Sequence, residues 1–432
     1  MSTIANTATS AASRVTIEAA SRRRWGIACL LGFGVLVNYL DRINLSVAQQ
    51  ALHAEFGISV VTFGYLLSAY SWTYAVCQVP AGVLLDRFGV LKVGRVSTLI
   101  WSAACFGAAI ATGVRGFVGA RLALGVGEAP TFPANAKAIG DWFPVNERSF
   151  ATSVFDSAAK FSSAIGIPII GLILIRFGWR ATFAVTGFLS LLYFVLFFCI
   201  YRNPSEDAGE SLENGESLCE KVCDPDLSLA YLLTRRKILG LCIGFAAYNY
   251  TFYLLLTWLP SYLSAELHID LLHSVVYTCV PWLFATITDL AIGGWIVDAL
   301  IRRGWNDSKV RQFVLIMGTA CGVGIFGATR ANTATAALFW ISLALGGLSA
   351  AAPVAWSIPS LIAPGNSVGR VGGILNFSSQ IAAIAAPILT GYIVSATGSF
   401  HGAFIAAGLF LLLGTTGYAF LLGRIERIPA RA

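Results

Sequence analysis

Charge is scarce in this chain of 432 residues, in which Asp, Glu, Lys and Arg together make up 12%. An average soluble domain carries roughly 25% charged residues, and that charge keeps its surface solvated. The chain is instead 56% hydrophobic, with a mean hydropathy of +0.73. A water-soluble enzyme, a nucleic-acid-binding protein and a disordered scaffold are therefore excluded. The composition predicts a protein embedded in a lipid bilayer.

Metal-ligand and disulfide patterns are also missing. The nine cysteines are scattered mostly through apolar runs, and none belongs to a CxxC or CxxH pair. The four histidines lie near the ends of apolar segments and form no cluster. We therefore expect most cysteines to be small buried hydrophobic residues. We expect no metal, no cofactor and no nucleic-acid partner.

A cleaved signal peptide is not expected either. Residues 1–21 are polar and rich in small side chains, and no apolar stretch precedes Arg22, Arg23 and Arg24. A signal peptide needs such a stretch before its cleavage site. The first apolar run is long enough to act as a signal-anchor by itself.

Twelve apolar runs are present, each long enough for a helix that crosses the roughly 30 Å hydrocarbon core. Their continuous apolar character, as in 189–200, argues against the period-two alternation of a β-barrel. The expected spans are about 25–48, 60–86, 91–112, 115–140, 149–175, 180–201, 237–263, 272–301, 310–329, 333–361, 369–396 and 400–423. We therefore predict an all-α membrane protein with twelve transmembrane helices.

Lys and Arg set the expected orientation, because they are retained on the cytoplasmic side. With the N-terminus inside, the outer loops hold only Arg115, Arg176, Arg180 and Arg330. The reverse topology would place most of the basic residues outside. Both termini are therefore expected in the cytoplasm.

A long acidic segment at about 203–234 divides the chain into two halves of six helices. It has few aromatics and many acids, which is typical of a solvated linker. A weak internal repeat supports the division: Gly82 and Asp86 leave the second helix, and Gly294 and Asp298 leave the eighth. The expected organisation is a cytoplasmic tail (1–24), a six-helix bundle (25–202), an acidic cytoplasmic linker (203–236), a second six-helix bundle (237–424) and a cytoplasmic tail (425–432).

Ionisable residues inside apolar runs are costly and mark function by default. Asp41 and Arg42 lie in the first run, and Arg121 and Glu128 in the fourth. Asp41 and Glu128 either form structural ion pairs or change protonation during function, since burial favours a neutral carboxyl. Arg42 is either a permanent partner of Asp41 or the fork that binds a planar carboxylate.

The fifth run contains Asp156 and Lys160, which are four positions apart and share one helix face. They either neutralise each other or leave Lys160 free to bind a second anionic group. The eighth run contains Asp289. Amides at membrane depth are costly unless satisfied, so we expect a polar site that also includes Tyr39, Tyr74, Tyr248, Asn249, Asn376 and Gln380.

The segment from Gly82 to Arg95 has charges that suit a gate. Gly82 permits close helix approach, and Asp86 and Arg87 can make inter-helix contacts that break in another conformation. Asp298 is expected to act similarly in the second half. The alternative is a plain turn with solvated charges.

These motifs resemble the major facilitator superfamily, and within it the anion:cation symporter family. The resemblance rests on Asn-Tyr-Leu-Asp-Arg-Ile-Asn-Leu-Ser-Val-Ala at 38–48, the loop segment 82–95, and Gly-Glu-Ala-Pro-Thr-Phe-Pro-Ala-Asn at 127–135 with Trp-Phe-Pro at 142–144. Leu-Thr-Trp-Leu-Pro at 256–260 and Gly-Gly-Ile-Leu-Asn-Phe at 372–377 extend it into the second half.

The resemblance implies two pseudo-symmetric six-helix bundles and proton-coupled import of an organic acid anion. Asp41 and Glu128 match the family's proton-coupling carboxylates, and Arg42, Tyr39 and Tyr74 match residues around the substrate. Arg121 matches a conformational or coupling arginine. A bacterial inner-membrane protein, working as a monomer with protons and a small organic anion, fits better than the animal sialin type, because the loop at about 53–59 is short.

One departure concerns the substrate. Sugar-acid members of the family tend to carry an amide and then an aromatic where this chain has Ala159 and Lys160. Loss of the amide and gain of a cation favour a substrate with two carboxylates over an aldonate.

The predicted function is thus a secondary transporter that imports an aldonate, aldarate, hexuronate or dicarboxylate with protons by alternating access. Alternatives are an aromatic-acid or tartrate-like carboxylate transporter and an anion exchanger. The least expected alternative is a membrane sensor that binds a ligand without transporting it. A membrane enzyme is not expected, because no catalytic Ser/His/Asp set or phosphate-binding loop is found in the sequence.

Overall fold

The structure is a computed structural model that describes residues 2–143, 148–202, 229–267, 271–331, 333–363 and 368–428. Within these ranges the regular structure is helical, as the composition predicts. The elements are α1 (Ser2–Val47), α2 (Gln49–Phe56), α3 (Val60–Ala109), α4 (Val114–Glu128), α5 (Thr131–Trp142), α6 (Arg148–Ile200), α8 (Leu229–Leu233), α9 (Arg236–Ala265), α10 (Leu271–Thr288), the π-helix η1 (Asp289–Ile296), α11 (Val297–Arg302), α12 (Asp307–Gly322), α13 (Ile325–Ala328), α14 (Ala334–Ile362), α15 (Val368–Thr397), α16 (His401–Thr416) and the π-helix η3 (Gly417–Leu422).

Each of the twelve predicted apolar runs coincides with a helical segment. The long helices α3 and α6 each contain two runs, joined at Gly89 and Gly178, where the backbone leaves helical geometry. The run at 272–301 is built from α10, η1 and α11 in succession, and α4 with α5 forms the run at 115–140.

Eight described helical stretches are long and apolar enough by themselves to cross a membrane. One of them, Ala151–Ile200, is 50 residues long, which is more than twice the roughly 20 residues that one span needs. The runs at 60–86, 91–112 and 115–140 are not among these stretches. Their helices belong to the same bundle, because α3 packs along α4 and α6, and α6 packs along α1.

Four glycines terminate helices at equivalent places in the fold. Gly89, Gly178, Gly304 and Gly398 follow the second, fifth, eighth and eleventh spans, with φ of 76°, 78°, 87° and 69°. This left-handed conformation costs glycine little and other residues more. The same turn therefore recurs once in every group of three helices, as expected for a fold built from three-helix repeats.

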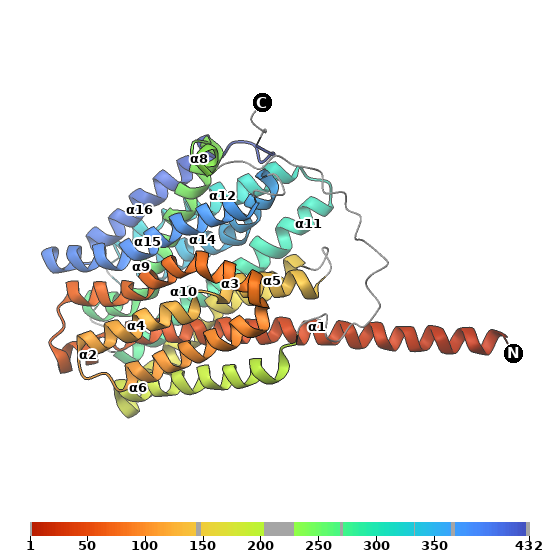
Figure 1. Cartoon of the computed structure of the whole chain (residues 1–432). Helices are drawn as coiled ribbons and strands as arrows, with labels where there is room; N and C mark the ends of the chain where they lie inside the picture. The colour runs from red at the N-terminus through yellow and green to blue at the C-terminus, as the bar shows by residue number, and fades with distance from the viewer. Residues whose placement is uncertain are drawn as a thin grey trace.

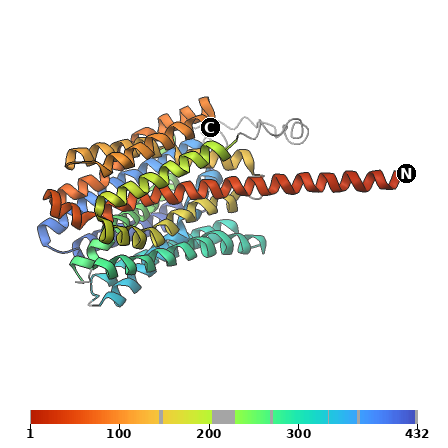
Figure 2. The same ribbon diagram turned by 90° about the horizontal axis from the view of Figure 1, so that it is seen from below.

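The two halves of the chain form two bundles that lie side by side (Figure 1). In the view from below, the N-terminal helices lie in front of the blue helices of the C-terminal half, and the teal helices lie along the lower edge (Figure 2). The halves meet where α6 packs on α10, α3 on α15 and α1 on α9.

The halves are tightly joined at the end of the molecule opposite the N-terminus. Gln50 Nε2 donates to Ser264 Oγ over 2.7 Å, and the hydroxyls of Tyr65 and Tyr392 are 3.1 Å apart. A Cβ on Gly64 would lie 2.7 Å from the carbonyl oxygen of Pro387. This close approach of α3 and α15 is possible only because Gly64 lacks a side chain.

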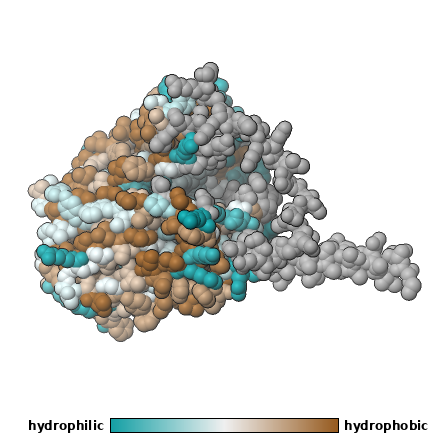
Figure 3. All heavy atoms as spheres, viewed as in Figure 1, coloured by the Kyte–Doolittle hydropathy of each residue, from teal (hydrophilic) through white to brown (hydrophobic). Residues whose placement is uncertain are grey.

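The surface between the two ends is mostly hydrophobic (Figure 3). Large apolar side chains are turned outward along it, for example Phe177 with 75% and Phe420 with 70% of their surface exposed. A soluble protein rarely exposes an apolar surface this extensive, so this belt is the lipid-facing surface.

Two predicted boundaries differ in detail from the structure. Residues 203–228 of the predicted linker lie outside the described residues, and its last part is partly helical, because α8 spans Leu229–Leu233. The predicted tail 1–24 is also helical, since α1 begins at Ser2.

Candidate functional site

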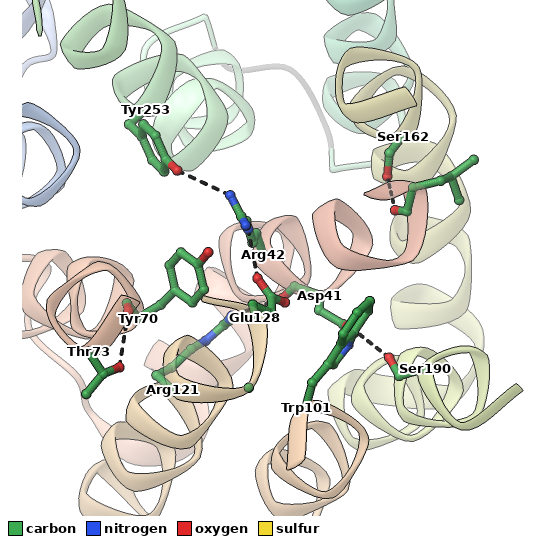
Figure 4. Close-up of polar contacts among 12 residues, drawn as sticks. Asp41, Arg42, Tyr70, Thr73, Trp101, Arg121, Glu128, Ser162, Ser190 and Tyr253 are labelled. Carbon is green, nitrogen blue, oxygen red and sulfur yellow. Dashed lines mark hydrogen bonds and ion pairs between the residues drawn. The ribbon is translucent and has the colours of Figure 1, made fainter. Parts of the chain in front are cut away.

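Arg42 lies at the centre of the interface between the two bundles (Figure 4). Its Nε atom is 3.0 Å from Oε2 of Glu128, at the end of α4, and both side chains are buried. Its Nη1 atom donates to the hydroxyl of Tyr253 over 3.3 Å, and Tyr253 belongs to α9 of the other half. One guanidinium thus contacts a carboxylate of the N-terminal bundle and a phenol of the C-terminal bundle.

Three further tyrosines surround the guanidinium. The Arg42 Cζ atom lies 4.5 Å from the ring centroid of Tyr39, 4.6 Å from that of Tyr70 and 5.3 Å from that of Tyr74. Aromatic faces at these distances attract a cation. We call this group of Tyr39, Tyr70, Tyr74 and Tyr253 the tyrosine cage.

Two glycines of α4 bring Glu128 to Arg42. A Cβ on Gly125 would lie 2.3 Å from the carbonyl oxygen of Tyr70 in α3, and a Cβ on Gly127 would lie 2.6 Å from the backbone nitrogen of Trp101. No larger residue fits at either position without moving the helix backbone. The Gly-x-Gly-Glu segment therefore holds α4 against both parts of α3, before and after Gly89, directly ahead of the carboxylate.

Asp41 has its own partners, although it is adjacent to Arg42 in the sequence. Its Oδ2 accepts hydrogen bonds from the indole of Trp101 and from Ser190 Oγ, the latter over 2.8 Å. Arg121 does not pair with this carboxylate: its Nη1 donates to the backbone oxygen of Asp41 over 2.9 Å.

A small cavity lies beside Asp41, lined also by Cys105, Arg121 and Phe183. Its volume of about 10 Å³ is close to the minimum that holds one water molecule. Asp41 Oδ1 is buried and has no hydrogen-bond partner among the described residues, so one carboxylate oxygen remains available.

Lys160 makes two ion pairs. Its Nζ lies 2.7 Å from Oδ2 of Asp156 on the same helix and 2.8 Å from Oδ2 of Asp289 in η1. The sequence predicted the first contact as one of two alternatives. It did not predict the second, which joins the two bundles.

The remaining predicted binding residues make mostly local contacts. Tyr248 stacks on Phe245, and Asn249 Nδ2 donates to the backbone oxygen of Phe245 over 3.1 Å. Asn376 Nδ2 donates to Gln78 Oε1 of the other bundle over 3.0 Å. Gln380 is buried, and its Oε1 has no hydrogen-bond partner among the described residues.

Comparison with known proteins identifies the family. The family model described as Major Facilitator Superfamily matches residues 31–327. The chain belongs to the Major Facilitator Superfamily. It is therefore a multi-pass membrane transporter, and its family is not one of enzymes.

The sequence similarity between this superfamily member and its relatives covers almost the whole chain. The uncharacterized transporter YybO of Bacillus subtilis is 38% identical, with 96% of this chain and 98% of that protein covered. The D-galactonate transporter of Escherichia coli O6:H1 is 31% identical (94% and 97% covered). The probable galactarate/D-glucarate transporter GarP of Escherichia coli K12 is 30% identical (94% and 96% covered). These relatives are of the anion:cation symporter type that the motifs indicate.

The superfamily fold is also found by comparison with solved structures. A bacterial homologue of the human lysosomal transporter Spinster, in an inward-facing and unoccupied conformation, superposes with a TM-score of 0.76 at 16% identity. The match covers 94% of this chain and 99% of that one. The predicted fold of two six-helix bundles is thus confirmed.

The predicted gate of this transporter is only partly visible. Gly82 has no close neighbour in this structure, because a Cβ there would meet nothing within 4 Å, so its role in close helix approach stays a prediction. Arg87 is exposed and lies over the ring of Phe88, and Asp298 is half-buried. The side chain of Asp86 lies outside the described residues, so the gating role of these charges stays a prediction.

Sequence reasoning missed Trp101 and Ser190 as partners of Asp41. Trp101 lies in an apolar run, where a tryptophan resembles a packing or interface residue. The feature that distinguishes Trp101 from such residues is its complete burial, which cannot be seen in the sequence. Tyr253 is one of several tyrosines near the middle of the predicted seventh span, and the sequence does not distinguish it from the others.

Proposed function

We propose that this transporter imports an organic acid anion together with protons by alternating access. The substrate class is a hydroxylated carboxylate such as an aldonate, aldarate or hexuronate. The observation that carries the proposal is the Arg42–Glu128 ion pair inside a tyrosine cage to which both bundles contribute.

Arg42 has an unused donor for a substrate. Nε is taken by Glu128 and Nη1 by Tyr253, but Nη2 is buried without a hydrogen-bond partner among the described residues. A guanidinium binds a carboxylate best with two parallel donors. A substrate carboxylate at Nη1 and Nη2 would displace the Tyr253 hydroxyl, and the phenols of the cage would lie beside its hydroxyl groups.

Proton coupling follows from competition for Arg42. While Glu128 is ionised, it neutralises the guanidinium and repels a second carboxylate. Protonation of Glu128 removes both effects, so proton and substrate favour the same state of the protein. Such a shared preference is what allows one gradient to drive the other.

Asp41 is the second carboxylate of this mechanism. Trp101 and Ser190 donate to Oδ2, Oδ1 has no hydrogen-bond partner among the described residues, and Asp41 lines the cavity together with Arg121. Arg121 donates to the backbone oxygen of Asp41, so α4 and α1 are connected directly beside this carboxylate. We propose that Asp41 exchanges its proton through this cavity when α1 and α4 move relative to each other.

The second-anion role predicted for Lys160 requires its release. In this structure Lys160 is held by two carboxylates, so a second substrate carboxylate would have to displace one of them. The relatives named for D-galactonate and for galactarate/D-glucarate support both monoanionic and dianionic substrates as candidates.

A thermal-shift screen followed by counterflow tests the proposal. The purified protein would be heated with aldonates, aldarates, hexuronates, aromatic acids and tartrate, and a bound ligand would raise the melting temperature through linkage. The stabilising acid should then enter proteoliposomes by counterflow and accumulate when the outside is more acidic. Counterflow without acid-driven accumulation would indicate an exchanger, and binding without counterflow a sensor; either result contradicts proton symport.

We also propose a bacterial inner-membrane location with both termini in the cytoplasm and a monomeric protein. This orientation is supported by the basic residues Arg23 and Arg24 in α1 and Arg302 and Arg303 at the end of α11, since α11 lies on the side of the bundle from which the N-terminal part of α1 extends (Figure 1).

A further inference from the structure

The ion pairs of Lys160 form a buried group with more negative than positive charge. Lys160 faces Asp156 at 2.7 Å and Asp289 at 2.8 Å, and Asp289 is 0% exposed. One ammonium balances one carboxylate, so with all three groups ionised a net charge of −1 remains. A buried charge without a partner costs several kcal/mol, and proton uptake removes that cost.

Asp289 is the member with the weaker set of partners. Its Oδ1 is buried without a hydrogen-bond partner among the described residues, whereas Asp156 is partly exposed to solvent. Its helix is fixed in place, because a Cβ on Gly293 would lie 2.5 Å from the ring of Pro353 in α14. Asp289 also opens η1, and π-helical turns inside helices are frequent at functional sites.

Few other ionisable groups surround Asp289. Lys160 and Asp156 face it from α6, and Tyr248 interacts with it from α9. The sequence of α14 contains no ionisable residue. Along its own span, Asp298 is nine positions away, which is about 13 Å along a helix. The state of Asp289 therefore depends mainly on Lys160 and Asp156.

Lys160 and Asp289 belong to different bundles, near the middle of the fifth and eighth spans. The pair is thus one of the contacts that hold the two halves in this arrangement. If Asp289 is neutral, Lys160 keeps Asp156 as its counter-ion on the same helix, and the attraction between the halves is lost.

We propose that Asp289 is a further proton-binding site, in the C-terminal bundle, and that its protonation releases the Lys160 bridge between the two halves. The proton comes from water and converts the carboxylate to a carboxylic acid. The site deepens the proposed function, because it adds a proton to those of Asp41 and Glu128.

Two substitutions of similar chemistry are expected to have opposite effects on the ion pair between Lys160 and Asp289. Asp289→Asn removes the bridge at every pH, so the halves move apart more easily. Asp156→Asn removes the excess charge instead, which leaves Lys160 and Asp289 as a balanced pair and strengthens the bridge. Asp307→Asn is the matched control, because Asp307 pairs with Arg311 within one helix, far from this group.

The first experiment detects the proton directly. Infrared difference spectra of the protein in lipid, recorded between acid and alkaline pH, contain the C=O band of each carboxylic acid that loses its proton. One component should be missing in Asp289→Asn and in Asp156→Asn but present in Asp307→Asn. A spectrum of Asp289→Asn identical to that of the wild type would overturn the proposal, and no transport activity is needed for this result.

The second experiment measures counterflow of the acid that the thermal-shift screen identifies. Asp156→Asn should slow exchange by about tenfold, which corresponds to 1.4 kcal/mol. Asp289→Asn should exchange at about the wild-type rate but move fewer protons per substrate. Equal slowing in both variants would show a merely structural ion pair. If no acid is transported, the proposed function fails while the infrared result still decides the proton site.

Discussion

The Nε atom of Arg42 lies 3.0 Å from Oε2 of Glu128, although the two residues are 86 positions apart in the sequence. Both are buried in the N-terminal bundle, and in the proposed function a substrate anion at Arg42 competes with this carboxylate or displaces the Tyr253 hydroxyl. In that proposal the pair links the occupancy of the binding site to the protonation of Glu128.

Glu128→Gln should separate exchange from accumulation. The amide keeps the shape of the side chain but takes up no proton, so acid-driven accumulation should fall to the level without a gradient, while counterflow remains within about a few-fold of the wild type. Uptake into proteoliposomes with and without a pH gradient measures both. Glu426→Gln, at an exposed carboxylate, is the control. Accumulation retained in Glu128→Gln would exclude Glu128 as a coupling residue.

Arg42→Lys should weaken binding even though the charge is kept. A lysine lacks the planar fork and makes a poorer contact with the stacked rings of Tyr39 and Tyr70. We expect Kd to rise by about 10- to 100-fold, equivalent to about 1.4–2.8 kcal/mol. Titration calorimetry with the identified acid measures it. Arg95→Lys is the matched control, because Arg95 also stacks on a ring, that of Phe198, but outside the site. An unchanged Kd for Arg42→Lys would place the substrate elsewhere.

Gly125→Ala should destabilise the protein and disturb the site. The added methyl would lie 2.3 Å from the carbonyl oxygen of Tyr70, so α4 has to shift, at a cost of about 1–3 kcal/mol. Gly119→Ala in the same helix meets nothing within 4 Å and should be neutral or slightly stabilising. Thermal unfolding in detergent compares them. Similar melting temperatures for the two variants would contradict the close packing of α3 and α4.

The contacts of Glu55, at the end of the molecule opposite the N-terminus, predict that the stability of the protein depends on pH. It accepts a hydrogen bond from the indole of Trp179 and pairs with Arg180 over 2.9 Å. These contacts lower the pKa of Glu55 below its ordinary value. A carboxyl whose pKa is lowered by folding stabilises the protein above its unfolded pKa, and this contribution is lost as the pH falls through the lower folded pKa.

The matching experiment compares the wild type with Glu55→Gln by thermal unfolding. The wild type should be the more stable of the two between pH 6 and 8, by an amount that does not change with pH in that range. The difference should shrink when the pH drops below about 4.3, the ordinary pKa of a glutamate. A difference that is the same at pH 4 and pH 7 would contradict the role of the ionised carboxylate.

Local features of the sequence were sufficient to predict the spans. An apolar run can be recognised from neighbouring residues alone, so the predicted segment 25–48 matches the apolar span Arg23–Val47 within α1, and the predicted segment 237–263 matches α9. The importance of Arg42 and Glu128 was equally predictable, because a charge at membrane depth is costly wherever its partner lies.

The partners of these charges were not predictable in the same way. Asp41 precedes Arg42, yet it is bonded to Trp101, and Arg42 is paired with Glu128. Neighbouring residues on a helix point about 100° apart, so their partners depend on which helices pack on each side. Gly82 shows the same limit: a glycine permits close helix approach but does not require it, and in this structure no neighbour lies within 4 Å of a Cβ placed there.

The scarcity of charge by itself determined that this protein lies in a membrane, and the apolar runs determined its twelve helices. Only the tertiary structure decided that Glu128 neutralises Arg42 and that Lys160 connects Asp156 to Asp289. The physical reason is that the energy of a buried ion pair depends on a few ångströms between atoms. Those distances are set by helix packing between segments that are far apart in the sequence.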